Sequence, residues 1–315
     1  MKKLLIFLIL PIAICAQPTS VPRDTSFAIY GTYIKERKTR PYIQIARPEQ
    51  SKTIAVKNDV VFRSIGERQL ILDVFYPKKT KKLKPAVLLI FGGGWRSGDK
   101  THNHAMATAL ANSGYVAVSP EYRLSMEAPY PAAVYDLKAA VKWLKTNYKS
   151  YGVDTNKIAV LGCSAGGQLA ALLGTTNNNS HFEDTFGGYK TSSTVHAVID
   201  IDGTLAFHHP ESVEGSAAAY WFGGTYAEKP ALWIEAAPLE HAGANTVPFL
   251  FVNSSIPRFH AGRTDFIQKL DHFHIYSEVH TLDDTPHPFW FFHPWFEPMM
   301  GFITDFLHQR FSVKN

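Results

Sequence analysis

The segment that most constrains this chain is Gly162-Cys-Ser-Ala-Gly166, a Gly-x-Ser-x-Gly sequence between an aliphatic run and a helical pattern. The run ends at Leu161 and predicts a buried strand, and residues 168–173 predict a helix. A tight turn between a strand and a helix accepts only small residues at its two glycine positions, because larger side chains would clash. Such a turn leaves the Ser164 hydroxyl exposed at the strand end, beside the N-terminal amides of the helix. The segment therefore predicts a serine nucleophile.

The rest of the chain alternates strand-like and helix-like segments, which predicts an α/β fold with a mostly parallel central sheet and helices on both faces. The 315 residues, 45% of them hydrophobic, suffice for one large domain with a full core, and no Pro/Gly/Ser-rich linker divides them. Antiparallel strands are expected at 60–62 and 70–76, further strands at 85–91, 115–119, 195–202, 247–253 and 274–282, and helices at 104–113, 132–148, 262–273 and 296–311.

The chain begins with the features of a secretory signal peptide. Two lysines precede an apolar stretch at 4–16 that is too short for a stable membrane span, and cleavage is expected after Ala16. Lipid attachment at Cys15 is the less favoured alternative, because Ile14 is bulky where a small residue would be expected. We therefore expect a secreted or periplasmic protein.

The predicted organisation has three parts. A signal peptide at 1–16 precedes an N-terminal extension at 17–52, in which 27–33 and 42–45 are possible edge strands. The α/β domain at 53–315 then contains a long insertion at about 204–246, rich in Ala, Trp and Gly, that is expected to form a cap or a substrate wall.

Charge and cysteine content exclude some classes of function. The formal net charge of +5 falls to +3 when the signal peptide leaves with Lys2 and Lys3, a mild excess that gives little support to nucleic acid binding. Of the two cysteines, Cys15 leaves with the signal and Cys163 lies within the predicted turn. No intramolecular disulfide is then possible in the mature chain, and its stability must come from packing.

A run of three glycines, Gly92-Gly-Gly94, follows the strand predicted at 85–91. A flexible turn would explain a lone glycine run. Together with the Gly-x-Ser-x-Gly turn, the run favours an oxyanion hole, in which each amide aimed at a developing anion contributes about 2.7–4 kcal/mol in the transition state. The expected donors are the amides of Gly93 or Gly94 and of Ala165.

Several motifs occur together in a fixed order. They are Phe91-Gly-Gly-Gly-Trp95, Pro120-Glu-Tyr-Arg-Leu124, Tyr130-Pro-Ala-Ala133, Asp136, Trp143 and Gly162-Cys-Ser-Ala-Gly-Gly167. In this order the chain resembles, over roughly residues 60–310, the α/β-hydrolases related to hormone-sensitive lipase and to bacterial carbohydrate and feruloyl esterases.

The family pattern has His-Gly-Gly-Gly, and here Phe91 replaces the histidine. Since the family's oxyanion donors are main-chain amides, the replacement is expected to alter the support of the loop more than the hole. The resemblance also implies that Glu121, Tyr122, Arg123 and Asp136 brace the loops near the site.

The resemblance implies a catalytic base late in the chain, in the order serine, acid, histidine. His287 directly follows the last predicted strand, where the family carries its His-Gly-Phe, and it is the expected base. His280, within that strand, and His293, among aromatic residues, are interpreted as packing or substrate-wall residues.

The acid is where the sequence departs from the family. Relatives carry Asp a few residues after the strand predicted at 247–253, and residues 254–261 contain no carboxylate. Asp202, at the end of the preceding strand, is the favoured replacement, since an orienting carboxylate is worth about 10⁴ in rate. The alternatives are Asp265, or Asp283 or Asp284 near the histidine. A serine–histidine dyad or a catalytically dead protein also remains open, as does a purely structural role for Asp202.

A serine, a histidine and oxyanion donors predict acyl transfer to water without a metal or an organic cofactor. No recognised metal-ligand spacing occurs among His208, His209, His272 and His274. The resemblance implies an exported esterase, similar to those associated with pectin breakdown, that removes acetyl, methyl or feruloyl groups from plant cell-wall polysaccharide such as pectin or hemicellulose. An esterified oligo- or polysaccharide is the expected partner, with neither nucleic acid nor a membrane span.

Side chains that could bind such a substrate include aromatic and basic residues. The aromatic residues form either a substrate rim or ordinary core; they are Trp95, Trp221, Phe222, Trp290, Phe292 and Trp295. Arg258 and Arg263 are expected to meet uronate carboxylates. Two other classes of function remain: a secreted peptidase of the prolyl-oligopeptidase kind, which usually has a propeller domain that this length cannot contain, and a non-catalytic binding protein with the same fold.

Overall fold

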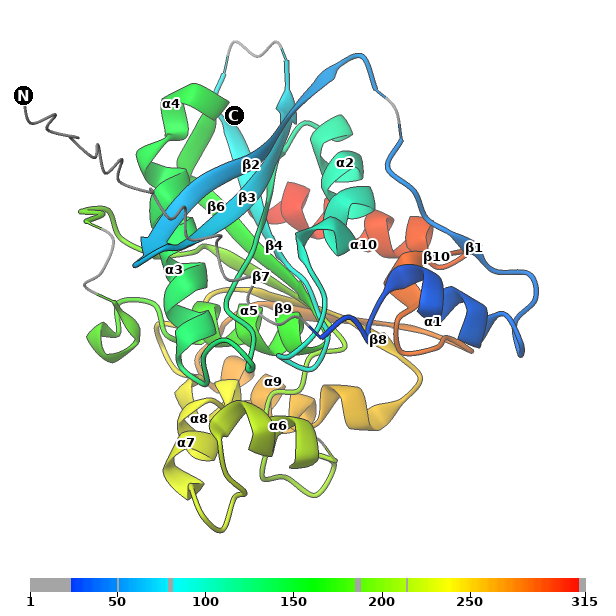
Figure 1. Ribbon diagram of the computed structural model, residues 1–315, viewed down its shortest axis with the longest axis vertical. Helices are drawn as coiled ribbons and strands as arrows, with labels where there is room; N and C mark the ends of the chain where they lie inside the picture. The colour runs from blue at the N-terminus through cyan, green and yellow to red at the C-terminus, as the bar shows by residue number, and fades with distance from the viewer. Residues whose placement is uncertain (1–23, 50, 79–81, 185–187, 214, 312–315) are drawn as a thin grey trace, which may run out of the picture.

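An eight-stranded sheet organises the molecule (Figure 1). The computed structural model describes residues 24–49, 51–78, 82–184, 188–213 and 215–311, so the expected signal peptide lies outside the described residues. The strand order is β2-β3-β5-β4-β6-β7-β8-β9. The strands are β2 (Ile54–Ile65), β3 (Arg68–Pro77), β4 (Lys84–Ile90), β5 (Val116–Pro120), β6 (Val153–Cys163), β7 (Ala197–Ile201), β8 (Phe249–Ser254) and β9 (Ser277–Leu282).

The sheet is mostly parallel, as the sequence predicts. Strands β4 to β9 pair in parallel, whereas β3 pairs antiparallel with both β2 and β5. The central strands β4, β5 and β7 are almost wholly buried, in agreement with their continuous aliphatic sequences. Because parallel strands end at the same edge, the loops that follow β4, β6, β7, β8 and β9 gather at one edge of the sheet.

Helices cover both faces of the sheet and enclose two apolar cores. On one face, α3 (Ala132–Thr146), α5 (Ala165–Thr175) and α9 (Arg263–His272) contribute to the first core. On the other face, α2 (His104–Asn112) and α10 (Phe296–Phe311) contribute to the second. This arrangement of helices confirms the predicted α/β architecture.

The insertion at 204–246 contains three short helices, α6 (Gly215–Phe222), α7 (Pro230–Glu235) and α8 (Pro238–His241). They gather at the lower end of the molecule in Figure 1. Trp221 of α6 stacks on Trp95, with ring centroids 5.0 Å apart and planes at 8°. This contact attaches the insertion to the loop after β4.

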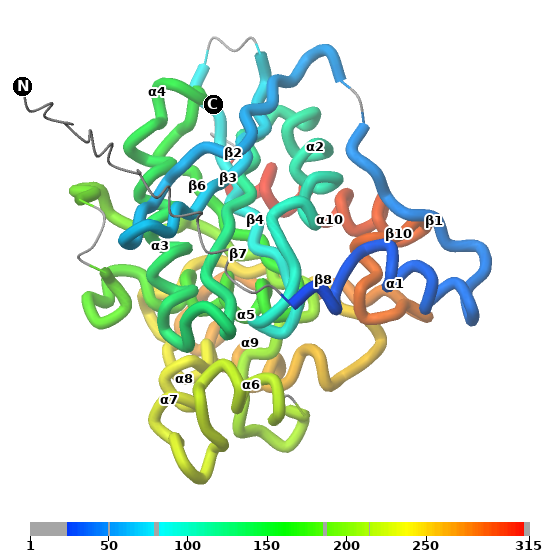
Figure 2. The backbone as a smooth tube through the Cα atoms, viewed as in Figure 1, coloured from blue at the N-terminus to red at the C-terminus, as the bar shows by residue number. Residues whose placement is uncertain are grey.

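The N-terminal segment differs from the prediction. Residues 27–33, a possible strand in the sequence, lie largely in the helix α1 (Ile29–Glu36). Ile29 and Tyr33 both pack against the second core, and their spacing of four residues suits one face of a helix, which outweighs the strand preference of the aromatic residues. The second possible strand is reduced to β1 (Gln44–Ile45), which pairs antiparallel with β10 (Phe292–His293) (Figure 2).

Within the described ranges, we find no helix long and apolar enough to cross a membrane.

Candidate active site

The turn between β6 and α5 has the strained geometry that the sequence predicts. Ser164 has φ 55° and ψ −122°, in the positive-φ region that is costly for a residue with a side chain. A Cβ on Gly162 would lie 1.9 Å from the carbonyl oxygen of Gly166, and a Cβ on Gly166 would lie 2.2 Å from that of Ile90. Only glycine fits at these two positions, so the sequence of the turn presents the Ser164 hydroxyl at the edge of the sheet.

Three side chains from separate loops form one hydrogen-bonded array. His287 Nε2 lies 2.8 Å from Ser164 Oγ, and His287 Nδ1 lies 2.9 Å from Asp202 Oδ2. The Asp202 side chain is fully buried, whereas that of His287 is 16% exposed. The buried carboxylate therefore faces the inner nitrogen of the imidazole, and the outer nitrogen faces the serine.

Asp202 is fixed on both of its carboxylate oxygens. It follows β7, and its Oδ1 accepts a hydrogen bond of 2.8 Å from the backbone N–H of Ser254, at the end of β8. The strand after which relatives carry their acid thus orients this carboxylate through a main-chain amide. Among the carboxylates that the sequence analysis considered, Asp202 is the one that lies against His287 Nδ1, and its role as the acid stays a proposal.

The other proposed acids lie with different partners. Asp265 is exposed and its Oδ2 is 3.2 Å from His209 Nε2, and Asp284 pairs with Arg40 at 3.2 Å. Asp283 has no hydrogen bond or ion pair to His287 among the described residues. The structure brings none of these carboxylates to the imidazole.

A second aspartate, Asp200, lies fully buried two residues before Asp202. Burial raises the pKa of its carboxyl well above the usual value, although a hydrogen bond from the Gly203 N–H, 2.8 Å long, opposes this shift. The second oxygen has no hydrogen-bond partner among the described residues. Both observations favour the neutral form of Asp200.

The glycine loop after β4 lies directly against the nucleophile. A Cβ on Gly92 would approach the Ser164 Cβ to 3.0 Å, and Gly94 lines a small pocket together with Ser164 and Ala165. Gly93 and Gly94 have φ of 129° and 61°. Within the described residues, no hydrogen bond engages the amides of Gly93, Gly94 or Ala165. These donors are therefore available to an oxygen atom at the serine, as an oxyanion hole requires.

Phe91 supports this loop in place of the family's histidine. Its ring stacks on Tyr122 at 4.3 Å, and its carbonyl oxygen accepts a hydrogen bond from the Tyr122 hydroxyl at 2.9 Å. Arg123 donates to Asp136 through both Nε and Nη2, and Arg68 forms an ion pair with Glu121. These polar residues brace the loops around the site, as the resemblance implies.

The aromatic side chains that could have formed a substrate rim are core residues instead. Their exposed fractions are 2% for Trp95 and Trp290, 0% for Trp221 and Phe292, 1% for Phe222 and 7% for Trp295. The prediction of Trp290 as a substrate-binding surface is therefore wrong: its ring packs edge-on against His287, at 5.1 Å and 89°. Trp95 keeps a position beside the site, since it lines the small pocket and donates from Nε1 to Gln168 Oε1 at 2.9 Å.

Phe259, which sequence reasoning missed, stacks on one face of the His287 imidazole. Its ring lies 3.4 Å from that of His287, at 11°, and the Arg258 guanidinium lies 4.0 Å from the other face of the phenyl ring. Both residues belong to the 3₁₀ turn η3 (Pro257–His260), in the segment where relatives carry the acid. Sequence signals for Phe259 are weak, because 21 phenylalanines are present and only the fold brings this one to His287.

We expect Phe259→Ala to lower kcat about tenfold while changing KM little, because the imidazole loses a packed neighbour that restricts its orientation. Phe259→Tyr should restore kcat, since the ring stack remains. The measurement is steady-state hydrolysis of 4-nitrophenyl acetate, with Phe273→Ala as the matched control, a 40% exposed phenylalanine at the end of α9. An unchanged kcat in Phe259→Ala would mean that the stack has no positioning role.

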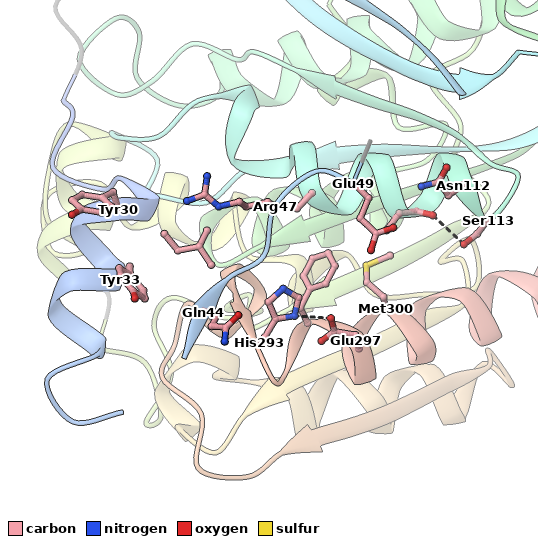
Figure 3. Close-up of a pocket in the computed structure, with 14 residues that line it drawn as sticks. Tyr30, Tyr33, Gln44, Arg47, Glu49, Asn112, Ser113, His293, Glu297 and Met300 are labelled. Atoms are coloured by element: carbon pink, nitrogen blue, oxygen red, sulfur yellow. Dashed lines mark hydrogen bonds and ion pairs between the residues drawn. The ribbon is translucent and has the colours of Figure 1, made fainter. Parts of the chain in front are cut away.

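The pocket at the serine is small. Its volume is about 20 Å³, and it is lined by Gly94, Trp95, Ser164, Ala165, Asp202, Thr204 and Phe259. A much larger groove, of about 790 Å³, lies apart from it between α1, α2 and α10 (Figure 3). In the described part of the chain, no group of three or more His, Cys, Asp or Glu side chains is arranged to hold a metal ion.

The sheet order, the strained serine turn and the Ser164–His287–Asp202 array define the α/β-hydrolase fold. The chain belongs to the BD-FAE family, whose profile matches residues 72–256, more than half of the 315 residues.

The chain is also similar to named esterases over part of its length. The chain is 32% identical to the esterase LipC of Mycobacterium tuberculosis over 193 residues, which are 59% of this chain and 47% of LipC. It is 37% identical to the M. tuberculosis carboxylesterase NlhH over 109 residues, 34% of each protein. The chain thus spans half or less of the length of these curated relatives.

Two solved structures share the fold over most of the chain. A truncated carbohydrate esterase from gut microbiota superposes with a TM-score of 0.70 at 24% identity, over 84% of this chain and 99% of that one. The thermophilic esterase Est2 of Thermogutta terrifontis gives 0.69 at 21% identity, over 85% and 96%.

Proposed function

We propose that this protein is a serine carboxylic-ester hydrolase that removes acetyl groups from polysaccharide. The observation that carries the proposal is the continuous array from Ser164 through His287 to the buried Asp202, next to unengaged amides of the glycine loop. An array of this kind has the parts that acyl transfer needs: a nucleophile, a base, an orienting carboxylate and donors for an oxyanion. The named esterases among its relatives support the same reaction class.

In the proposed reaction, Ser164 Oγ attacks the ester carbonyl carbon while His287 Nε2 takes the hydroxyl proton. Amides of Ala165 and of Gly93 or Gly94 donate to the anionic oxygen of the tetrahedral intermediate. The intermediate collapses as the C–O bond to the sugar breaks, and the protonated His287 gives its proton to the departing sugar oxygen. Water then attacks the acyl-enzyme by the same route and releases acetate, which restores the serine.

The small pocket supports a short acyl group. Its walls are fixed: Trp95 is held by the hydrogen bond to Gln168 and by its stack on Trp221, and Gln168 Nε2 in turn donates to the Ala236 carbonyl at 2.8 Å. An acetyl group needs little room beside Ser164, whereas a feruloyl group would need these side chains to move. The geometry therefore favours acetyl over feruloyl among the groups that the family resemblance implies.

The polysaccharide part of the proposal has separate support. A carbohydrate esterase from gut microbiota is among the structures with the same fold, and the sequence of residues 1–16 is that expected of an exported protein, which would meet such polymers outside the cell. Arg258 is exposed beside the pocket and stacks on Phe259, where a substrate carboxylate would meet its charge.

Mass spectrometry of the products tests this function. Acetylated xylan, acetylated pectin and feruloylated arabinoxylan would be incubated with the enzyme and with Ser164→Ala. Release of acetate by the native protein alone is the expected result. Release of ferulate or methanol without acetate would overturn the acyl assignment, and cleavage of peptide amides in preference to esters would point to a peptidase.

We expect Trp95→Phe to accept longer acyl chains. The smaller ring opens the pocket, and one methylene in such a pocket changes discrimination by about 1–3 kcal/mol, so the ratio of butyrate to acetate turnover should rise roughly tenfold or more. The lost hydrogen bond to Gln168 should also lower the free energy of unfolding by about 1–3 kcal/mol.

The matched control for this experiment is Trp143→Phe, a buried tryptophan of α3 that packs on Tyr151 outside the pocket. It should leave the ratio of 4-nitrophenyl butyrate to acetate turnover unchanged. Equal ratios in the two variants would contradict the role of Trp95 as a wall of the acyl pocket.

A further inference from the structure

The groove between α1, α2 and α10 is a second concave surface that the proposed hydrolysis does not use. Its volume of about 790 Å³ is in the range of ligand sites, whereas the pocket at Ser164 holds about 20 Å³. Its apolar lining residues are Ile45, Ala105, Ala109, Phe296 and Met300. The N-terminal segment, α2 and the C-terminal helix α10 all contribute to its walls (Figure 3).

Polar groups with unused hydrogen-bonding capacity also line the groove. Gln44, Arg47, Glu49 and Asn112 line it, and their side chains make no hydrogen bond or ion pair with any described residue. These are planar amide, guanidinium and carboxylate groups, which together supply hydrogen-bond donors and acceptors. A ligand in the groove would therefore meet hydrogen-bond donors and hydrogen-bond acceptors at several positions.

A paired histidine and glutamate lie in the centre of the groove. His293 Nδ1 and Glu297 Oε1 are 2.6 Å apart, and the two side chains are 37% and 63% exposed. His293 is opposite Gln44 in the β1–β10 ladder, so the two residues belong to one short sheet. The pair leaves His293 Nε2 and the second oxygen of Glu297 available to a ligand.

Charge in the groove is nearly balanced. Arg47 carries one positive charge, Glu49 and Glu297 carry two negative charges, and His293 adds a positive charge only when it is protonated. A polyanion such as a polyuronate gains no attraction from this set, because the two carboxylates oppose its charges. The balance favours a neutral ligand that is rich in hydroxyl groups.

Aromatic side chains stand at one end of the groove. Tyr30 and Tyr33 of α1 line it, with ring centroids 6.3 Å apart, and Tyr30 is 67% exposed. Exposed tyrosine offers an apolar face and a polar tip, which suits a sugar ring with its apolar C–H face and its hydroxyl rim. In Figure 3 these rings lie at the opposite end from Glu49 and Ser113, so the groove is elongated.

From these features we propose that the groove binds a neutral polysaccharide chain and holds the polymer near the esterase site. This proposal rests on the proposed function, because the groove would hold an uncharged stretch of the same polysaccharide, while any uronate lies near Arg258 at the Ser164 site. The chain from His287 to His293 is six residues long and reaches at most about 20 Å, so the groove lies within that distance of the site along the backbone. A polymer that is bound in both places would present its acetyl groups at a raised local concentration.

Affinity gel electrophoresis tests binding without turnover. Ser164→Ala, and the same variant carrying Tyr30→Ala or Glu49→Gln, would be run in gels that contain deacetylated xylan, glucomannan or polygalacturonate. Xylan or glucomannan should retard Ser164→Ala, and each groove substitution should weaken the retardation. The matched controls are Tyr42→Ala, a 54% exposed tyrosine outside the groove, and Glu67→Gln, an exposed glutamate in the turn after β2.

Kinetics with the active protein give an independent readout. On acetylated xylan, the groove variants should raise KM roughly threefold to tenfold with kcat unchanged, and on 4-nitrophenyl acetate they should match the native enzyme. Equal retardation of groove and control variants, retardation by polygalacturonate alone, or no retardation in any gel would overturn the inference. The gels measure polysaccharide binding and need no turnover. Absence of esterase activity would therefore contradict the proposed function, and the gels would still show whether the groove binds the polymer.

Discussion

Replacing Ser164 with alanine is expected to lower kcat for 4-nitrophenyl acetate by a factor on the order of 10⁵ to 10⁶. The hydroxyl is the atom that forms the acyl-enzyme, and no neighbouring group can take its place: the adjacent Cys163 thiol is fully buried and burial raises its pKa well above the usual value. What remains would be the contribution of the oxyanion amides and of binding.

The control is Ser255→Ala, an exposed serine in the segment after β8. It should retain native kinetics, and both variants should keep the native melting temperature to within a few degrees, because the Ser164 side chain is bonded only to His287 among the described residues. More than one percent residual turnover in Ser164→Ala, after a second purification, would contradict the assignment of the nucleophile.

Asp202→Asn is expected to lower kcat by about 10⁴, whereas Asp265→Asn should change it less than twofold. An asparagine at position 202 can present its amide to His287 Nδ1 and so favour the wrong imidazole tautomer, while it keeps the size of the side chain. Asp265 is exposed and pairs with His209, so its replacement leaves the array untouched.

The comparison is best made across pH on 4-nitrophenyl acetate, with circular dichroism to confirm folding, because Asp202 Oδ1 also accepts from the Ser254 amide. The asparagine amide can turn its oxygen to that donor, which should preserve the fold. If Asp265→Asn lost more activity than Asp202→Asn, Asp202 would not be the acid and Asp265 would take that role. Native activity in both variants would instead support a serine–histidine dyad.

Local sequence patterns were sufficient for the fold and for the serine turn. The alternation of aliphatic strands with helices predicted the mostly parallel sheet, and the two glycines of the turn predicted the strained serine, since each pattern depends on neighbours in the sequence. The proposed acid could not be identified from local patterns alone. Asp202 and His287 are 85 residues apart, and only the packing of β7 beside β8 shows that the Ser254 amide orients this carboxylate.

The burial of the aromatic residues could not be predicted from the sequence. Tryptophan suits a sugar-binding rim and a core equally, and the choice at Trp221 and Trp290 depends on the insertion folding back over the glycine loop and on η4 (Phe289–Phe291) packing under His287. The stack of Phe259 on His287 is likewise invisible in the sequence, because the two residues lie in different loops. Each of these contacts joins segments that are distant in the chain.

The most direct test of the central claim, that Ser164 is a nucleophile activated by His287, is intact-protein mass spectrometry after reaction with a fluorophosphonate. We expect one adduct per chain, located at Ser164 by peptide mapping, formed far more slowly in His287→Ala and absent in Ser164→Ala. Labelling that is unchanged in Ser164→Ala, or a native protein that takes up no label, would contradict it.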